Sequence, residues 1–156
     1  ENVKMKSDYL DIISNSVGVA PVFIDSELVS AQLRKRYYWT NWEFCAPSDR
    51  GLKFQDVLES GDARAPKAFA LTRTYYKGGG EATRQRNFRK SQRPISWIND
   101  STTRHLTPLE CERLQTVPEG YTEGVPKTQR LMMLGNGWTV DVIAHILRSI
   151  PPAPPA

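Results

Sequence analysis

The sequence contains few cysteines and no long apolar run. Only Cys45 and Cys111 occur among the 156 residues, too few for the disulfide framework of a small secreted domain and suited to a reducing compartment. No apolar run approaches the roughly 20 residues that a membrane-spanning helix needs, and the N-terminus has no signal-peptide pattern. These absences exclude a membrane protein and a disulfide-stabilised scaffold.

Length and composition predict one packed domain. The chain has a mass of 17.7 kDa, and its 156 residues fall within the range of about 100–200 that one domain usually takes. Hydrophobic residues make up 39% and charged residues 24% of the sequence. This composition supplies enough apolar material for a core, so a wholly disordered chain is not expected.

Acidic residues are nearly absent from the stretch between Arg64 and Arg93. It contains nine basic residues and one acid, Glu81, a net charge of +8, which leaves 12 basic and 16 acidic residues for the rest of the chain. A positive stretch on an acidic body indicates a polyanionic partner, because each neutralised phosphate releases a counterion. A solubilising loop is the alternative interpretation. The basic residues are Arg64, Lys67, Arg73, Lys77, Arg84, Arg86, Arg89, Lys90 and Arg93.

The first part of the chain alternates helix and strand signals. Ser7 or Asp8 can cap a helix that ends at Gly18. Short strands are expected at residues 21–24 and 36–42, and Glu1-Asn2-Val3 is typical of a strand end. The apolar stripe of the helix consists of Tyr9, Leu10, Ile13 and Val17.

The middle of the chain, residues 45–100, is irregular in pattern. Three glycines at positions 78–80 lie inside the basic stretch, with turn-forming residues on both sides. Structureless connections of this length are uncommon unless they are functional. We therefore expect a long functional loop or a small subdomain here.

A well-marked helix start follows. Thr107 can be the N-cap, Pro108 suits the first helical position, and Glu110 completes a capping box. Leu106 and Cys111 have the spacing of a hydrophobic staple across that cap. Cys111 is therefore interpreted as a small core residue and not as a nucleophile.

The C-terminal region predicts two more helices and a tail. The first ends near Leu134 and is followed by a turn at Gly135-Asn136-Gly137. The proline-rich residues 151–156 should be extended. The second helix has one apolar face, made of Val140, Ile143, Leu147 and Ile150.

The densest polar motif is the segment Gln32-Leu33-Arg34-Lys35-Arg36. If this segment is extended, Gln32, Arg34 and Arg36 project from one face, since side chains alternate along a strand. Paired guanidinium groups form a planar donor array that suits a carbonyl oxygen or phosphates. On spacing alone, an edge strand protected by charges is the favoured explanation of the motif.

Four blocks occur in an order that resembles the second half of a DNA (cytosine-5)-methyltransferase. They are Glu1-Asn2-Val3, the Gln-x-Arg-x-Arg pattern at 32–36, Arg104-x-Leu-Thr-Pro-x-Glu-x-x-Arg-Leu-Gln ending at Gln115, and Gly135-Asn136 before Val140. They bracket a basic variable region and cover nearly the whole chain. Tyr37-Tyr38-Trp39-Thr40-Asn41 and Trp138 are most similar to the animal de novo group and its phage or bacterial relatives.

The resemblance implies an α/β fold: the C-terminal part of a Rossmann-like, S-adenosylmethionine-dependent methyltransferase domain with a small inserted target-recognition region. Residues 1–44 would form the second part of the catalytic sheet, and 45–100 the target-recognition region with the basic loop 64–93. Residues 101–150 would return to the catalytic domain as helices, and 151–156 would form the proline-rich tail.

The reaction of this family explains why a carboxyl group and guanidinium groups occur in these motifs. A cysteine thiolate adds to C6 of cytosine and makes C5 nucleophilic toward the methyl group of S-adenosylmethionine, which places negative charge on N3 and O2. By resemblance, Glu1 is the N3 partner and Arg36 the O2 partner of that charge. Arg34 would support the catalytic loop or a phosphate. The target base must leave the duplex to reach such a pocket.

The resemblance also assigns the cofactor and DNA contacts. Asn136, Trp138 and Val140 match the block that closes the S-adenosylmethionine pocket, although plain core packing is an alternative for Trp138. The expected partner is double-stranded DNA, with most contacts to phosphates and one or two to base edges. The candidate DNA-binding residues are Arg73, Arg84, Arg86, Arg89 and Lys90.

Two family motifs are absent from the sequence: the Phe-x-Gly-x-Gly cofactor loop and the Pro-Cys pair of the nucleophile. Cys45 is followed by Ala46-Pro47, the reverse order, so we expect no catalytic role for it. We expect a chain that begins midway through the catalytic domain, is inactive alone, and exposes unpaired strand edges and apolar surface. A missing N-terminal half (in the same polypeptide or a separate chain) or a homodimer would cover that surface.

Two functional hypotheses remain at this stage. The first is a part of the methyltransferase, and the alternative is a non-catalytic DNA-binding remnant or a subunit of a split enzyme. No metal site is expected. A cytoplasmic, bacterial or phage-encoded protein is favoured over a nuclear one.

Overall fold

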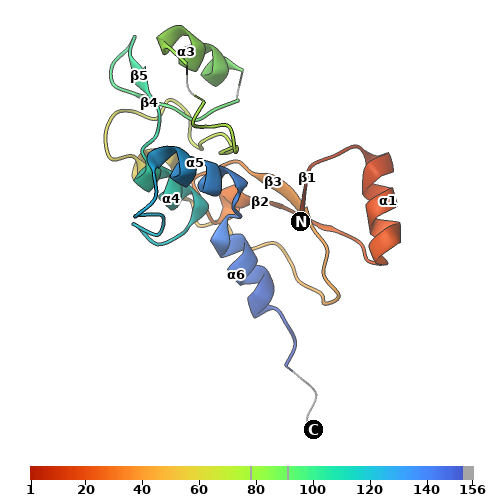
Figure 1. Ribbon diagram of the computed structural model, residues 1–156. Coiled ribbons are helices and arrows are strands. Elements are labelled where there is room, and N and C mark those ends of the chain that lie inside the picture. Colours follow the sequence, from red (N-terminus) through yellow and green to blue (C-terminus); the bar gives the residue numbers. More distant parts are fainter. Residues whose placement is uncertain (78, 91, 153–156) are drawn as a thin grey trace.

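The computed structural model describes residues 1–77, 79–90 and 92–152. Figure 1 shows a small sheet at the centre, helix α1 to one side, and a second group of elements around α3 to the other. The strands are β1 (Asn2–Val3), β2 (Val22–Asp25), β3 (Lys35–Tyr38), β4 (Ser96–Trp97) and β5 (Thr103–Arg104). The helices are α1 (Ser7–Val17), α2 (Phe54–Val57), α3 (Glu81–Arg89), α4 (Pro108–Gln115), α5 (Lys127–Asn136) and α6 (Val140–Arg148), with a 3-10 turn at Ser26–Leu28.

The central sheet has the strand order β1-β3-β2, and both outer strands run antiparallel to β3. β1 and β2 therefore run in the same direction on either side of β3. Helix α1 makes the crossover that connects them, because two parallel strands cannot be joined by a short turn. The register sets Val3 opposite Arg36 and Phe23 opposite Tyr37. The expected α/β arrangement of the N-terminal region is thus present, with β3 shorter than the predicted strand at 36–42.

Two apolar clusters form the core. The smaller one packs Ile24 and Tyr38 of the sheet against Val142 and Ile146 of α6. The predicted apolar face of this helix is wrong, because Val140, Leu147 and Ile150 are exposed and only Ile143 of that set packs against the cluster. The larger cluster lies between α4, α5 and the segment that follows α2. It contains Ala31, Phe54, Ala68, Leu71, Tyr75, Leu106, Cys111, Leu114, Leu131 and Leu134.

Helix α4 begins as predicted. The Thr107 hydroxyl accepts a hydrogen bond from the Glu110 N–H at 3.1 Å, and the Glu110 carboxylate accepts one from the Thr107 N–H at 2.8 Å. Leu106 and Cys111 are both fully buried in the larger cluster. Burial raises the pKa of the Cys111 thiol well above its usual value, which confirms an unreactive core residue.

Helix α1 matches its predicted bounds but not its predicted cap or burial. The N-cap is Lys6, without a side-chain hydrogen bond, in place of Ser7 or Asp8; Gly18 ends the helix with φ 73°. None of its residues is buried, and Tyr9 is 62% exposed. Of the predicted apolar stripe, Tyr9 and Val17 are exposed and Leu10 and Ile13 are half-buried, and Figure 1 shows α1 standing apart from the other helices.

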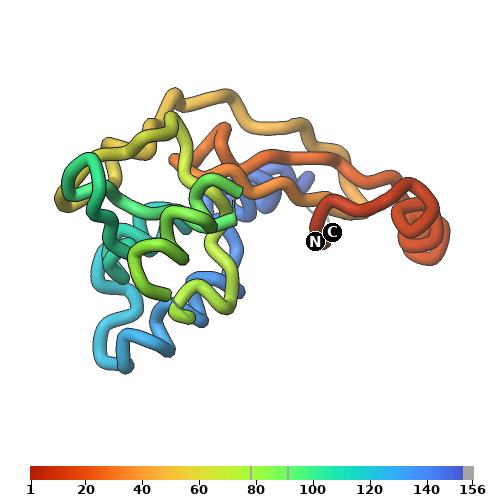
Figure 2. Tube along the Cα trace, turned by 90° about the horizontal axis from the view of Figure 1, so that it is seen from above, coloured from red at the N-terminus to blue at the C-terminus, as the bar shows by residue number. Residues whose placement is uncertain are grey.

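The region at 45–100 is more ordered than its sequence pattern indicates. After β3 the chain runs back along the molecule to α2, as Figure 2 shows, and it contains α3 and strand β4. β4 pairs with β5 at residues 103–104, so this ribbon crosses the predicted boundary at residue 100. The division into domains stays a prediction.

Two predicted features fall partly outside the described residues. Gly78 of the glycine turn and residues 153–156 of the predicted tail are not described. In the part of the chain that the structure describes, no helix is long and apolar enough to cross a membrane.

Candidate functional site: two pockets and a basic helix

A polar pocket of about 260 Å³ lies at the end of the central sheet. It brings together parts of the chain that are more than 100 residues apart in sequence: strand β1, the residues around the start of β3, and the end of α5. Its lining is Glu1, Asn2, Val3, Arg34, Arg36, Gly135 and Asn136. Three of the predicted catalytic residues and one predicted cofactor residue therefore share one pocket.

Glu1 and Arg36 form an ion pair in this pocket. Nε of Arg36 lies 2.8 Å from Oε1 of Glu1, and the two side chains are 17% and 14% exposed. Nη1 of Arg36 donates to the Lys35 carbonyl at 2.8 Å. The pairing of β1 with β3 sets Val3 opposite Arg36. Glu1 lies two residues before Val3, so its carboxylate comes within reach of the Arg36 guanidinium. A carboxyl group and a planar donor thus face the same small space.

Arg34 is a buried brace at the back of the pocket. Its Nη1 donates to the Leu71 carbonyl at 2.9 Å and its Nη2 to the Gly137 carbonyl at 2.8 Å. Only 5% of the residue is exposed, and burial together with the nearby Arg36 lowers the pKa of the guanidinium. Arg34 therefore joins the segment at Leu71 to the turn after α5.

Gln32 lies deeper than the two arginines and does not line the pocket. Its Nε2 donates to the Leu114 carbonyl at 3.1 Å, and its Oε1 accepts from the Leu71 N–H at 2.8 Å. Of the three residues predicted to share a face, Arg34 and Arg36 reach the pocket, and only Arg36 belongs to the regular strand. Gln32 serves as an internal hydrogen-bonding link.

Gly135 allows α5 to approach the segment at Leu71–Arg73. A Cβ atom on this glycine would lie 2.2 Å from the Thr72 carbonyl oxygen, a distance that no side chain can adopt. The Arg73 backbone N also lies close to Gly135, which lines the polar pocket. The Arg73 side chain is exposed. The predicted turn at Gly135-Asn136-Gly137 is wrong in its start, because α5 extends to Asn136 and Gly135 is a buried helical residue. This packing role of Gly135 was therefore not predicted.

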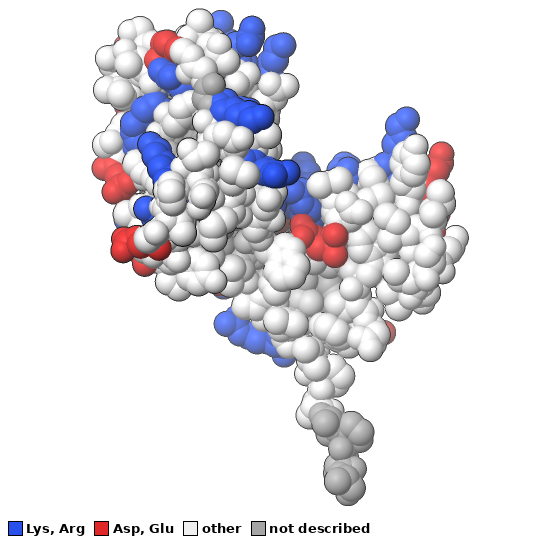
Figure 3. Space-filling model, in the orientation of Figure 1, with Lys and Arg blue, Asp and Glu red and all other residues white. Residues whose placement is uncertain are grey.

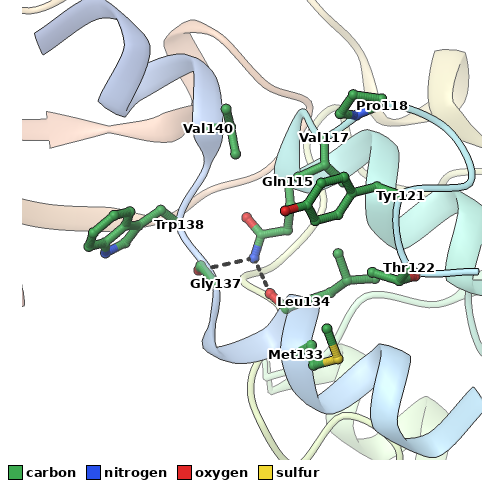
Figure 4. Close-up of a pocket in the computed structure, with 10 residues that line it drawn as sticks. All are labelled: Gln115, Val117, Pro118, Tyr121, Thr122, Met133, Leu134, Gly137, Trp138 and Val140. Atoms are coloured by element: carbon green, nitrogen blue, oxygen red, sulfur yellow. Dashed lines mark hydrogen bonds between the residues drawn. The ribbon is translucent and has the colours of Figure 1, made fainter. Parts of the chain in front are cut away.

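Trp138 and Val140 line a second, apolar pocket of about 330 Å³. Figure 4 shows Trp138 and Tyr121 at opposite ends of it, with Met133 and Leu134 along one wall. The buried Gln115 amide donates to the carbonyl oxygens of Leu134 and Gly137 and fixes the turn at the pocket base. The predicted cofactor residues are therefore divided, since Asn136 lies in the polar pocket.

The Trp138 side chain is not a core residue in this chain. It is 54% exposed, and Val140 is 41% exposed. The alternative of plain core packing for Trp138 is therefore wrong for the described structure. An exposed indole beside an apolar pocket can stack on a planar ligand.

The predicted DNA-binding residues lie on and around α3. Arg86, Arg89 and Lys90 are exposed, as is Arg73. Figure 3 shows Lys and Arg side chains gathered over this part of the molecule, beside a hollow that separates it from the part carrying α1. The exposed cations face solvent on a helix that has no buried residue.

Arg84 differs from the other basic residues of α3. Its Nε donates to the Thr103 hydroxyl at 3.2 Å, its Nη1 to the Gly79 carbonyl at 2.8 Å, and its Nη2 to the Glu81 carboxylate at 2.7 Å. All three guanidinium nitrogens are thus engaged within the protein. The arrangement favours a role for Arg84 in orienting α3.

Glu81 fastens the start of α3 to strand β5. Its carboxylate accepts hydrogen bonds from the Thr103 hydroxyl at 2.6 Å and from the Thr103 N–H at 3.0 Å. These bonds, with further ones from Gln85 and Arg84, lower the pKa of Glu81 to about 2. At the other end of α3, the Phe88 ring packs against Phe69 and Trp97.

Neither cysteine belongs to the polar pocket. Cys45 is exposed and Cys111 is fully buried, and neither contributes to the pocket lining. Among the described residues, no group of three or more His, Cys, Asp or Glu side chains is arranged to hold a metal ion.

Sequence comparisons identify one protein family. The model of the C-5 cytosine-specific DNA methylase family matches residues 28–151. The chain is 43% identical over 47 residues to the type II methyltransferase M.Sau3AI of Staphylococcus aureus. It is 36% identical over 53 residues to the DNA (cytosine-5)-methyltransferase DRM2 of Oryza sativa subsp. japonica. These alignments cover 11% and 9% of the relatives.

Solved structures show the same fold at low sequence identity. The Entamoeba histolytica methyltransferase EhMeth has a TM-score of 0.59 and 14% identity, over 83% of this chain and 52% of that protein. A mutant DNMT2 of Spodoptera frugiperda has a TM-score of 0.55 and 15% identity, over 94% of this chain and 64% of that protein. The predicted fold class, part of a methyltransferase domain, is confirmed.

Proposed function

Because the chain belongs to the C-5 cytosine-specific DNA methylase family, we propose that it forms the target-holding part of a DNA cytosine C5-methyltransferase. The observation that carries this proposal is the pairing of Glu1 with Arg36 in a small polar pocket. The proposed substrate is a cytosine that has left a double-stranded DNA helix. The proposed methyl donor is S-adenosylmethionine.

The two side chains suit the edge of a cytosine ring. Arg36 can donate to the O2 oxygen, and Glu1 can accept from the exocyclic amine and, when protonated, donate to N3. When a nucleophile adds to C6, negative charge develops on N3 and O2, and both groups would stabilise it. Arg34 would keep the pocket in shape through its bonds to the carbonyls of Leu71 and Gly137.

The apolar pocket fits the nucleoside part of S-adenosylmethionine, which supplies the methyl group on a sulfonium sulfur. The exposed indole of Trp138 offers a face on which a purine ring can stack, and Val140 adds apolar surface beside it. We propose that Asn136, at the border of the polar pocket, contacts the cofactor or the turn that holds it.

Double-stranded DNA would lie against the basic face of α3. Arg86, Arg89, Lys90 and Arg73 are exposed and suit contacts to phosphates, which supply most of the affinity of such interfaces. For Arg84 we propose an orienting role, since its donors are occupied by Thr103, Gly79 and Glu81.

A further segment would have to supply the cysteine nucleophile, because neither Cys45 nor Cys111 is near the polar pocket lining. We propose that an N-terminal half, in the same polypeptide or in a separate chain, supplies it, and that the present chain is inactive alone. The exposed apolar residues Val3, Tyr9 and Ile12 would be covered by that half, or by a second copy in a homodimer.

The proposal is tested by methyl transfer with a complementing half. The chain is produced together with a methyltransferase N-terminal segment that contains a Pro-Cys pair, and the incorporation of labelled methyl groups into duplex DNA is measured. We expect activity only with both parts. Glu1→Gln preserves the hydrogen-bonding shape but cannot donate a carboxyl proton, so methyl transfer should fall at least 100-fold while DNA binding remains.

The alternative function gives a different result in the same assay. A non-catalytic DNA-binding module would bind DNA in a salt-sensitive manner, and neither complementation nor Glu1→Gln would alter any activity. Salt-sensitive binding without methyl transfer, for several complementing segments, would therefore favour the alternative. Absence of salt-sensitive DNA binding would contradict both.

A further inference from the structure

A second hollow lies directly beside the polar pocket, and the proposed chemistry does not use it. It has a volume of about 460 Å³, and its charged lining is Lys4, Lys35 and Arg36. Its apolar walls include Val3, Leu33 and Phe69. We call it the basic hollow. At this volume it lies in the range of ordinary ligand sites, about 300–1,000 Å³, and it exceeds what a single phosphate ion requires.

Two of the three charges of the basic hollow, those of Lys4 and Lys35, are weakly compensated, whereas Arg36 is paired with Glu1 of the polar pocket. No carboxylate lines it, and Lys4, which is exposed, takes part in no ion pair among the described residues. Nζ of Lys35 lies 3.9 Å from the Asp25 carboxylate, with the lysine side chain 54% exposed, and such solvated pairs contribute little. The hollow is therefore a place where an anion gains attraction at a small desolvation cost.

The position of the basic hollow links the polar pocket to α3. It shares Val3 and Arg36 with the polar pocket. On its other side, the Phe69 ring packs against Phe88 of α3, with ring centroids 5.6 Å apart. A strand that follows the basic face of α3 and delivers one base to the polar pocket would pass through this hollow.

We propose that the basic hollow binds the phosphodiester backbone of DNA on one side of the extruded cytosine. This inference rests on the proposed function and adds residues to it, namely Lys4 and Lys35. Phosphate contacts fix the register of a nucleic acid on a protein, and rotating a base out of the helix requires that the flanking backbone be gripped. The apolar walls provide contact for the deoxyribose.

The test is a salt titration of binding to a duplex that contains one extrahelical cytosine. Each lost phosphate contact reduces the magnitude of the negative slope of log K against log salt by about 0.9, so Lys4→Ala combined with Lys35→Ala should reduce that magnitude by about 1.8. The control variant combines Lys53→Ala with Arg148→Ala, which removes the same charge from exposed positions outside the basic hollow and α3. It should leave the slope nearly unchanged.

A neutral methylphosphonate then locates the contact on the DNA. Next to the extrahelical cytosine, it should weaken binding by the unsubstituted chain and have no further effect on the Lys4/Lys35 double variant. Placed eight base pairs away, it should affect both proteins alike. Thermal unfolding and circular dichroism of each variant establish that it is folded.

Several outcomes separate the two proposals. If the unsubstituted chain fails to bind DNA in a salt-sensitive manner, the proposed function fails. If it binds, but the double variant has the same slope and the same response to the methylphosphonate, only the assignment of the basic hollow is overturned. Binding of poly-glutamate that requires Lys4 and Lys35, when DNA binding does not, would assign the hollow to an acidic protein and overturn the proposal.

Discussion

At the scale of single residues, the proposed function rests on three side chains that line the polar pocket and differ in how they are held. Glu1 and Arg36 are partners in an ion pair that remains partly accessible, so a ligand can compete for both. Arg34 donates hydrogen bonds to two backbone carbonyls. It cannot turn toward a ligand without breaking these hydrogen bonds. The pocket thus contains two groups suited to contact a base and one that maintains its walls.

Substitutions of Arg36 and Arg34 should therefore differ in what they affect. Arg36→Lys keeps the charge but loses the planar donor array, so we expect methyl transfer by the complemented enzyme to fall 10- to 100-fold with little change in melting temperature. Arg34→Lys leaves a buried carbonyl unsatisfied at Leu71 or Gly137, which costs about 1–3 kcal/mol. Differential scanning calorimetry measures the stability of the two variants, and the methyl-transfer assay measures their activity. Equal loss of stability in Arg36→Lys and Arg34→Lys would contradict the different roles of the two arginines.

At Gly135, the addition of a single methyl group should lower the stability of the fold. In Gly135→Ala the new Cβ would meet the Thr72 carbonyl, and we expect a loss of about 1–3 kcal/mol in the free energy of unfolding, measured by urea denaturation. Gly80→Ala is the matched control, because nothing lies within 4 Å of its Cβ position and its φ is −58°. A Gly135→Ala variant as stable as the control would contradict the close approach.

At the scale of elements, α3 is a polar helix that depends on its two ends. It has no buried residue, and such a helix is stable only when other contacts support it. Glu81 binds Thr103 at its start, and Phe88 packs against two rings near its end. The basic face is therefore presented by a helix anchored at both termini.

We predict that Glu81→Gln weakens DNA binding although it removes a negative charge from the interface region. Loss of the carboxylate contacts with Thr103 should make the position of α3 less fixed. Its Lys and Arg side chains would then no longer be held in one arrangement for binding phosphates. Fluorescence anisotropy with duplex DNA should show several-fold weaker binding. The control is Glu123→Gln, which changes the charge equally at an exposed position away from α3; tighter binding by Glu81→Gln would contradict the anchoring role.

The same carboxylate predicts a dependence on pH. The folded-state pKa of Glu81 is about 2, below the value of about 4.3 for an unfolded chain. Its stabilising contribution is therefore complete above about pH 4.5 and is lost as the pH falls toward 2. The hydrogen-exchange protection of α3 amides, measured relative to an unstructured peptide at the same pH, should fall over this range in the unsubstituted chain and depend less on pH in Glu81→Gln.

Sequence patterns predicted the local elements well and the long-range ones poorly. The capping box at Thr107 and the left-handed end at Gly18 are set by neighbouring residues, so they could be predicted. The face that α6 buries depends on the sheet it packs against, and Val142 and Ile146 were not in the predicted face. Helix α3 was not predicted, because its residues show no apolar periodicity and it is stabilised by Thr103 and Phe69. Likewise, Arg34 was expected to support the catalytic loop or a phosphate, and its bonds to the carbonyls of Leu71 and Gly137 could not be predicted because those residues are distant in sequence.

At the scale of the whole molecule, the central sheet and helix α1 both expose large apolar side chains. Val3, Tyr9, Ile12 and Phe23 are each more than 40% exposed, and patches of this kind mark surfaces that associate. The fold and the family were predictable because the sequence blocks at 1–3, 32–36, 104–115 and 135–140 survive as recognisable motifs. What covers the outer surface was not predictable from those motifs.

We predict that the chain associates when it is produced alone. Analytical ultracentrifugation should show dimers or larger species at micromolar concentration. Tyr9→Ser combined with Ile12→Ser should shift the population toward monomer without lowering the melting temperature, since neither side chain is buried. A monodisperse monomer with a high melting temperature would argue against an exposed interaction surface.

The most direct test of the central claim is the affinity of this chain for duplexes with one extrahelical base. Fluorescence anisotropy compares extrahelical cytosine with extrahelical thymine, which lacks the exocyclic amine that Glu1 would accept from. We predict a preference for cytosine of about 10-fold, equivalent to about 1.4 kcal/mol, that Glu1→Ala abolishes. Equal affinity for the two bases, or a preference that survives Glu1→Ala, would contradict the assignment of the polar pocket to cytosine.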